Sequence, residues 1–166
     1  MKVQKLFIAT KAFIVRNPVN PAEAGHGASG KVLIVRESNK YEEGTNAAKF
    51  DVPGGRLTPG ERFDGSLRRE VKEETGLEVK IGKPFFVNEW RPVVKGEQWQ
   101  VVGIFFECTL KSDFSEKSDF PKLTDAKVIL SGDHDAFEWI LPEEYAKYPL
   151  IENLKVAFEA YLARRQ

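Results

Sequence analysis

The segment from Phe63 to Thr75 places acidic side chains beside an apolar row, and this arrangement restricts how the chain can fold. The segment has no proline and is rich in residues that favour a helix, and Gly76 follows as a residue suited to a left-handed helix end. Phe63, Leu67 and Val71 recur every four residues, which predicts one buried helix face. We therefore expect a helix over 63–75 that packs against a larger core.

The acidic side chains of this segment are Glu70, Glu73 and Glu74, whose spacing makes their Cβ atoms neighbours on a helix at roughly 5–6 Å. At about 100° per residue, Glu70 and Glu74 border the apolar row. Like charges at the edge of a buried face are costly unless a cation accompanies them. Because Mg²⁺ prefers carboxylate oxygens, waters and substrate phosphates as ligands, the pattern predicts a divalent metal site.

Two glycines, Gly54 and Gly55, precede the predicted helix and follow a short apolar stretch, Phe50 to Pro53. Glycine permits positive φ and a close approach of the backbone, so this pair predicts a tight turn at a strand end. The next loop returns Glu61 toward the start of the helix.

Together these residues resemble the signature box of the Nudix hydrolases. That box is a glycine, five residues, a glutamate, seven residues, arginine-glutamate, an aliphatic, any residue, two glutamates, any residue, a glycine and an aliphatic. Every specified position is filled, by Gly55, Glu61, Arg69, Glu70, Val71, Glu73, Glu74, Gly76 and Leu77. Seven fixed residue types at about one in fifteen each, with roughly 150 starting places, make a chance match on the order of 10⁻⁶.

The resemblance implies that Glu70, Glu73 and Glu74 bind Mg²⁺ or Mn²⁺, with Glu61 supporting or sharing a metal. A backbone carbonyl of the Gly54–Gly55 turn is a further candidate ligand. Such ions neutralise diphosphate oxygens and activate water for attack on phosphorus. Arg69 precedes a predicted ligand, and we expect it to orient a carboxylate through a charge-assisted bond.

The general base is open, because the family places it either within the box or on a later loop. Glu73 is the candidate within the box. Glu97, Asp133 and Asp135 are acids on predicted loops outside it, although exposed acids are common. Asp133 is the preferred external choice, because it precedes His134 and a predicted strand.

Substrate contacts are predicted from aromatic and basic residues. Tyr41 and Trp90 can stack on a nucleobase, as can Phe86 and Trp99, although aromatic residues in strands are more often part of the core. Arg56, directly after the glycine pair, is the third predicted substrate contact.

The charge balance argues against a polymeric nucleic acid as partner, since Lys plus Arg and Asp plus Glu are 25 each. Cys108 is the only cysteine, so no intramolecular disulfide is expected. The N-terminus lacks the layout of a signal peptide, and the longest apolar run is too short to span a bilayer. We expect a cytoplasmic protein with no membrane partner.

The remaining pattern predicts a single domain over residues 1–166 with an α/β/α sandwich and a mixed β-sheet, a fold similar to that of Nudix domains. The loop over 38–49 is a candidate pocket wall. The expected strands cover 5–16, 31–36, 50–52, 78–81, 84–93, 98–110, 127–130 and 136–141, and the expected later helices cover 142–148 and 151–165.

The predicted function is metal-dependent hydrolysis of a phosphoanhydride in a nucleoside triphosphate or another nucleoside diphosphate derivative. An ADP-ribose or nucleotide-sugar pyrophosphatase is the first alternative, for which Pro92 is a weak indication. A non-catalytic nucleotide-binding regulator is the second, although no glutamate of the box is missing. A homodimer is plausible in this family.

Overall fold

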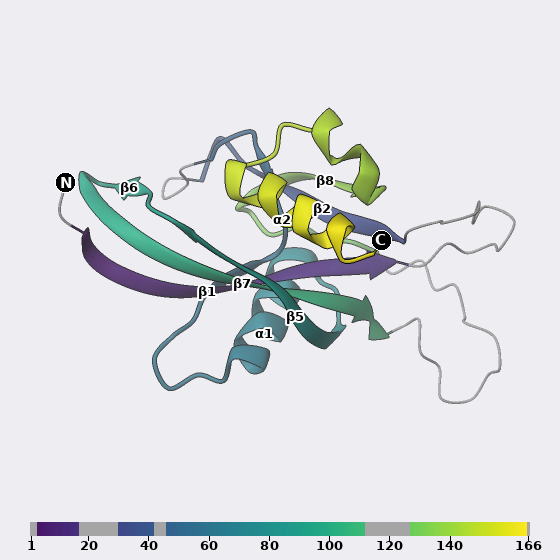
Figure 1. Cartoon of the computed structure of the whole chain (residues 1–166), viewed down its shortest axis with the longest axis horizontal. Helices are drawn as coiled ribbons and strands as arrows, with labels where there is room; N and C mark the ends of the chain where they lie inside the picture. Colours follow the sequence, from purple (N-terminus) through teal and green to yellow (C-terminus); the bar gives the residue numbers. More distant parts are fainter. Residues whose placement is uncertain (1–2, 17–29, 42–45, 112–126, 166) are drawn as a thin grey trace, which may run out of the picture.

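The computed structural model describes residues 3–16, 30–41, 46–111 and 127–165. These residues form a mixed eight-stranded sheet with one helix on each face (Figure 1). In chain order the elements are β1 (Val3–Arg16), β2 (Lys31–Glu37), β3 (Phe50–Asp51), β4 (Gly54–Arg56), α1 (Phe63–Thr75), β5 (Val79–Trp90), β6 (Val93–Val94), β7 (Glu97–Leu110), β8 (His134–Ile140), the 3₁₀ helix η2 (Pro142–Lys147) and α2 (Glu152–Ala163). The predicted α/β/α sandwich is confirmed.

The central strands are β1 and β7, which run parallel, while the other strand pairs are antiparallel. Successive side chains of a strand point to opposite faces. Phe13 of β1 therefore packs in a core with α2, whereas its neighbour Ile14 packs in a core with α1. Each face of the sheet is thus covered by its own helix.

The predicted apolar row of α1 is buried at Leu67 and Val71, both fully inaccessible to solvent. Phe63, in contrast, remains 47% exposed at the first turn and stacks on Phe106 with ring centroids 5.4 Å apart. The helix has the predicted bounds, and Gly76 ends it at φ 71°. No helix formed by the described residues is long and apolar enough to cross a membrane.

The sheet divides at β1 and β2, and this division makes room for a site. The two strands pair only at Val15 with Val32 and at Arg16 with Lys31. Further along, β1 pairs with β4, whereas β2 pairs with β3 and β8. Backbone groups freed by this separation face the chain between β3 and β4, where Ala12 N–H donates to the Pro53 carbonyl.

Two predicted strand assignments are wrong in detail. Residues 127–130 form no strand, because the backbone here binds carbonyl groups at the end of α1. The Ile129 N–H donates to the Thr75 carbonyl, and the Ser131 N–H donates to the Glu74 carbonyl. Residues 79–90 form one continuous strand with register shifts on both sides of Pro84, which has no N–H to donate to β7. Most of the predicted connection over 17–30 and most of the loop over 111–124 lie outside the described residues.

Two glycine substitutions in and beside α1 are expected to have opposite effects on stability. A Cβ at Gly76 would lie 3.3 Å from the Cβ of Ile129 in a left-handed conformation, so Gly76→Ala should destabilise the protein by about 1 kcal/mol. Gly65 is helical with nothing within 4 Å of such a Cβ, so Gly65→Ala should stabilise it by about 0.5 kcal/mol. Urea unfolding of the two variants measures both, and shifts of the same sign would contradict this assignment.

Candidate active site

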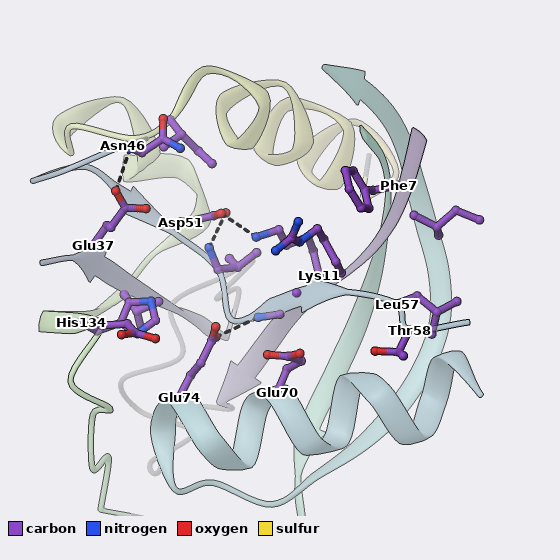
Figure 2. A pocket seen from close by; sticks show the side chains of 18 of the residues that line it. Phe7, Lys11, Glu37, Asn46, Asp51, Leu57, Thr58, Glu70, Glu74 and His134 are labelled. Atoms are coloured by element: carbon purple, nitrogen blue, oxygen red, sulfur yellow. Dashed lines mark hydrogen bonds and ion pairs between the residues drawn. The ribbon is translucent and has the colours of Figure 1, made fainter. Parts of the chain in front are cut away.

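A pocket with a volume of about 840 Å³ lies where β1 and β2 separate. Figure 2 shows Glu70 and Glu74 of α1 on one side of it and Lys11 of β1 on the other, with the short strand β4 running between them. Asp133 and His134 line it before and at the start of β8. The pocket therefore joins the carboxylates of the box to segments far from it in sequence.

Glu74 is one of two partly buried helix carboxylates that line the pocket. Its Oε2 accepts a hydrogen bond of 3.0 Å from the backbone N–H of Gly54. Burial raises the pKa of Glu74 to about 8, against the opposing effects of Lys11 and the Gly54 N–H, and the neighbouring Glu70 and Asp51 raise it further. A carboxylate in this position is stabilised in its charged form by an added cation.

Glu70 lies directly against the backbone of Gly55. A Cβ at Gly55 would lie 2.8 Å from the carboxyl carbon of Glu70 and 2.9 Å from both its oxygens. Only glycine therefore lets the Glu70 carboxylate approach the backbone this closely. This contact gives a spatial reason for the pairing of a glycine and a glutamate fifteen residues apart.

Arg69 holds three carboxylates of the box from the solvent side. Its guanidinium nitrogens lie 3.1 Å from Glu61, 3.1 Å from Glu70 and 3.0 Å from Glu73. The hydrogen bond from Arg69 lowers the pKa of the Glu61 carboxyl. Glu61 lines the pocket, whereas Glu73 is not among the lining residues and its side chain is 58% exposed.

The donor set suits a hard divalent cation by its chemistry. Among the described residues, no group of three or more histidine, cysteine, aspartate or glutamate side chains is gathered closely enough to hold a metal ion. Arg69 and the Gly54 N–H instead engage Glu70 and Glu74 separately. The carboxylate oxygens of Glu70 and Glu74 nevertheless lie beside the Gly54–Gly55 turn, and oxygen atoms of this kind are the ligands that Mg²⁺ prefers.

The acids proposed as an external base lie in different surroundings. Asp133 lines the pocket beside His134, whose Nδ1 lies 3.2 Å from Ser131 Oγ. Burial lowers the pKa of His134, although Asp133 acts to raise it. Asp135 is paired with Arg36, and Glu97 is paired with Lys5, and neither acid is among the lining residues.

Only two of the three predicted substrate contacts line the pocket. Tyr41 lines the pocket, and so does Arg56, whose guanidinium carbon lies 4.9 Å from the Phe7 ring centroid and 5.2 Å from that of Trp99. Trp90 is not among the lining residues. Its ring instead covers Gly103, where an added Cβ would lie 2.4 Å from its Cζ3.

Two residues of the pocket, Lys11 and Asp51, were missed by the sequence reasoning. Lys11 Nζ lies 2.7 Å from Asp51 Oδ2, with side chains only 12% and 26% exposed. Burial acts to lower the pKa of Lys11, but the attraction and hydrogen bond of Asp51 outweigh it, and the pKa is raised. The sequence feature that could have indicated this pair is Lys11 itself. It lies two residues before Phe13 and therefore on the same face of an apolar strand.

A family model described as NUDIX domain matches residues 24–161. The chain belongs to the Nudix family. It is 26% identical over 141 residues to the CTP pyrophosphohydrolase of Escherichia coli, covering 82% of this chain and 85% of that protein. Nudix hydrolase 2 of Arabidopsis thaliana is 29% identical over 146 residues, covering 82% of this chain but 46% of its own length.

A further Nudix relative is the nucleoside triphosphatase NudI of Salmonella arizonae, 25% identical over 117 residues, which cover 64% of this chain and 72% of that protein. The fold matches the crystal structure of the MutT protein of Methanosarcina mazei with a TM-score of 0.72 at 24% identity, covering 98% of this chain and 97% of the other. Nudix hydrolases cleave nucleoside diphosphate derivatives and generally depend on a divalent metal. The predictions of family, fold and enzyme class are therefore confirmed: the chain is a phosphoanhydride hydrolase.

The raised pKa of Glu74 predicts how the metal-free protein responds to pH. The folded state favours the protonated form, so the stabilising effect is complete below the usual pKa of 4.5 and is lost as the pH rises toward about 8. In the presence of a chelator, the free energy of unfolding should fall over this range by roughly 3–5 kcal/mol. Urea unfolding at several pH values measures this loss.

The matched variant Glu74→Gln cannot ionise and should lack this contribution to the pH dependence. Glu152→Gln, on a side chain that is 84% exposed, serves as the control and should follow the wild type. Identical pH profiles for the wild type and Glu74→Gln would show that Glu74 does not titrate as described.

Proposed function

We propose that this Nudix hydrolase is a metal-dependent nucleoside triphosphate pyrophosphohydrolase. The observation that carries the proposal is the position of Glu70 and Glu74, which both reach from α1 to the Gly54–Gly55 backbone in one pocket. The names of the CTP pyrophosphohydrolase and nucleoside triphosphatase relatives support a triphosphate as substrate.

Glu70 and Glu74, with the Gly55 carbonyl, would hold Mg²⁺ or Mn²⁺, and Glu61 and Glu73 would support or share it. When bound, such a cation neutralises diphosphate oxygens and lowers the pKa of a coordinated water. Arg69 orients the carboxylates by its three ion pairs, because a guanidinium binds carboxylates at fixed angles.

Other pocket residues would bind the substrate and remove a proton from the attacking water. Arg56 follows Gly55 and faces the pocket, so its positive charge can hold a phosphate. Asp133 is the preferred general base, since it lines the pocket whereas Glu73 does not, and it would take the proton of the attacking water. Tyr41 also lines the pocket and can contact the nucleoside.

The second candidate function is hydrolysis of ADP-ribose or a nucleotide sugar. The pocket volume of about 840 Å³ lies toward the upper end of the range for small-molecule sites, which leaves room for a second sugar. Pro92 adds no support, because it lies outside the pocket lining and its carbonyl accepts a bond from Trp99. A non-catalytic nucleotide-binding regulator is the third candidate function.

The test is Mg²⁺-dependent hydrolysis of a panel of nucleoside triphosphates, dinucleoside polyphosphates, ADP-ribose and nucleotide sugars. We expect pyrophosphate and a nucleoside monophosphate from a triphosphate, and no product in the presence of a chelator. A monophosphate plus a sugar phosphate would instead identify the second candidate. Nucleotide binding without any product would identify the regulator.

Substitution of the proposed ligands should remove activity without removing the fold. Glu70→Gln and Glu74→Gln are each expected to lower kcat by at least about 100-fold, because the charge that holds the cation is lost while the shape is kept. Glu152→Gln is the matched control, because Glu152 is not among the pocket-lining residues and its side chain is 84% exposed. Wild-type turnover by Glu74→Gln across the panel would contradict the proposed metal site.

A further inference from the structure

The ion pair of Lys11 and Asp51 brings a positive charge into the interior of an acidic pocket. Figure 2 shows Lys11 reaching from β1 to Asp51 of β3, above the β4 backbone, with Glu70 and Glu74 below it. Both side chains line the pocket, and Lys11 is the more buried of the two, at 12% exposed. A pair this enclosed is costly to desolvate, so stability alone is a weak reason for its presence.

The charge of Lys11 acts on the carboxylates proposed to hold the metal. Electrostatic attraction links Lys11 to Glu74 and Glu70 as well as to Asp51. Lys11 of β1 therefore supplies positive charge to these carboxylates in addition to that of Arg69. A divalent cation entering between Glu70 and Glu74 is attracted by the carboxylates but repelled by this ammonium.

We propose that Lys11 weakens the binding of free metal and favours entry of the metal together with the nucleotide, an inference that depends on the proposed function. The phosphates of a metal–nucleotide complex are anionic, so they attract the ammonium that the free cation repels. The same lysine thus has opposite effects on the two ligands. Lys11 would be a positioning and selectivity residue and would take no part in bond cleavage.

A merely structural role makes a different prediction. If Lys11 served only to tie β1 to β3 through Asp51, its removal would loosen the β4 turn, and both ligands would bind less tightly. The sign of the change for free metal therefore separates the two roles. Asp51 provides an internal check, because loss of its negative charge should weaken the binding of free metal.

The experiment measures binding of Mn²⁺ alone by electron paramagnetic resonance, in the wild type, Lys11→Met and Asp51→Asn. We expect Lys11→Met to bind free Mn²⁺ roughly three- to tenfold more tightly and Asp51→Asn to bind it more weakly. The double variant, which removes the pair without changing the net charge, should return toward the wild type. Lys147→Met is the matched control, since this lysine is 69% exposed and paired with Glu144.

A second titration uses the Mn²⁺ complex of a triphosphate analogue with methylene groups in place of both anhydride oxygens. Lys11→Met should bind this complex several-fold less tightly than the wild type does. Lys11→Gln is carried in parallel, and urea unfolding establishes that each variant is folded at the assay temperature.

Unchanged or weaker binding of free Mn²⁺ by both folded Lys11 variants would overturn this role for Lys11 and leave the proposed function intact. Unchanged or tighter binding of the Mn²⁺–analogue complex by the Lys11 variants would also overturn this role. A wild type that binds no Mn²⁺ in either form would instead overturn the proposed metal site, and the role of Lys11 with it.

Discussion

The contact between the α1 carboxylates and the β4 backbone is the constraint on which the rest of the structure depends. Glu70 lies against Gly55, and Glu74 accepts the Gly54 N–H, so the helix and the turn must meet with no side chain between them. That approach requires β4 to sit beside β1 in place of β2. The division of the sheet, the pocket and the position of α1 are all consistent with this one contact.

The charges around this contact determine the chemistry that it can support. Burial favours the neutral form of Glu74, while Arg69 on the solvent side and Lys11 on the sheet side supply positive charge. Enclosed acids with strongly shifted pKa values are costly for a fold, and they gather where a site must bind or transfer charge. That cost is consistent with the proposal that this pocket binds a cation and a phosphoanhydride.

The parts of the fold that could be predicted from the sequence are those decided by neighbours in the chain. The bounds of α1 follow from its helix formers and from Gly76, and the strand expected over 5–16 lies within β1. Residues 127–130 show the limit of this reasoning. Their composition favours a strand, but the unsatisfied carbonyls at the end of α1 bind their N–H groups instead.

The sequence by itself determined the family and the candidate metal ligands, because the box places its acids within a single helix and turn, where spacing in the chain dictates spacing in space. Only the tertiary structure decided which other residues share the pocket. Lys11 and Asp51 are 40 residues apart, Asp133 enters at β8, and Trp90 turns away to cover Gly103. The physical reason is that strand pairing joins distant segments, and no local pattern specifies which strand a residue will lie beside.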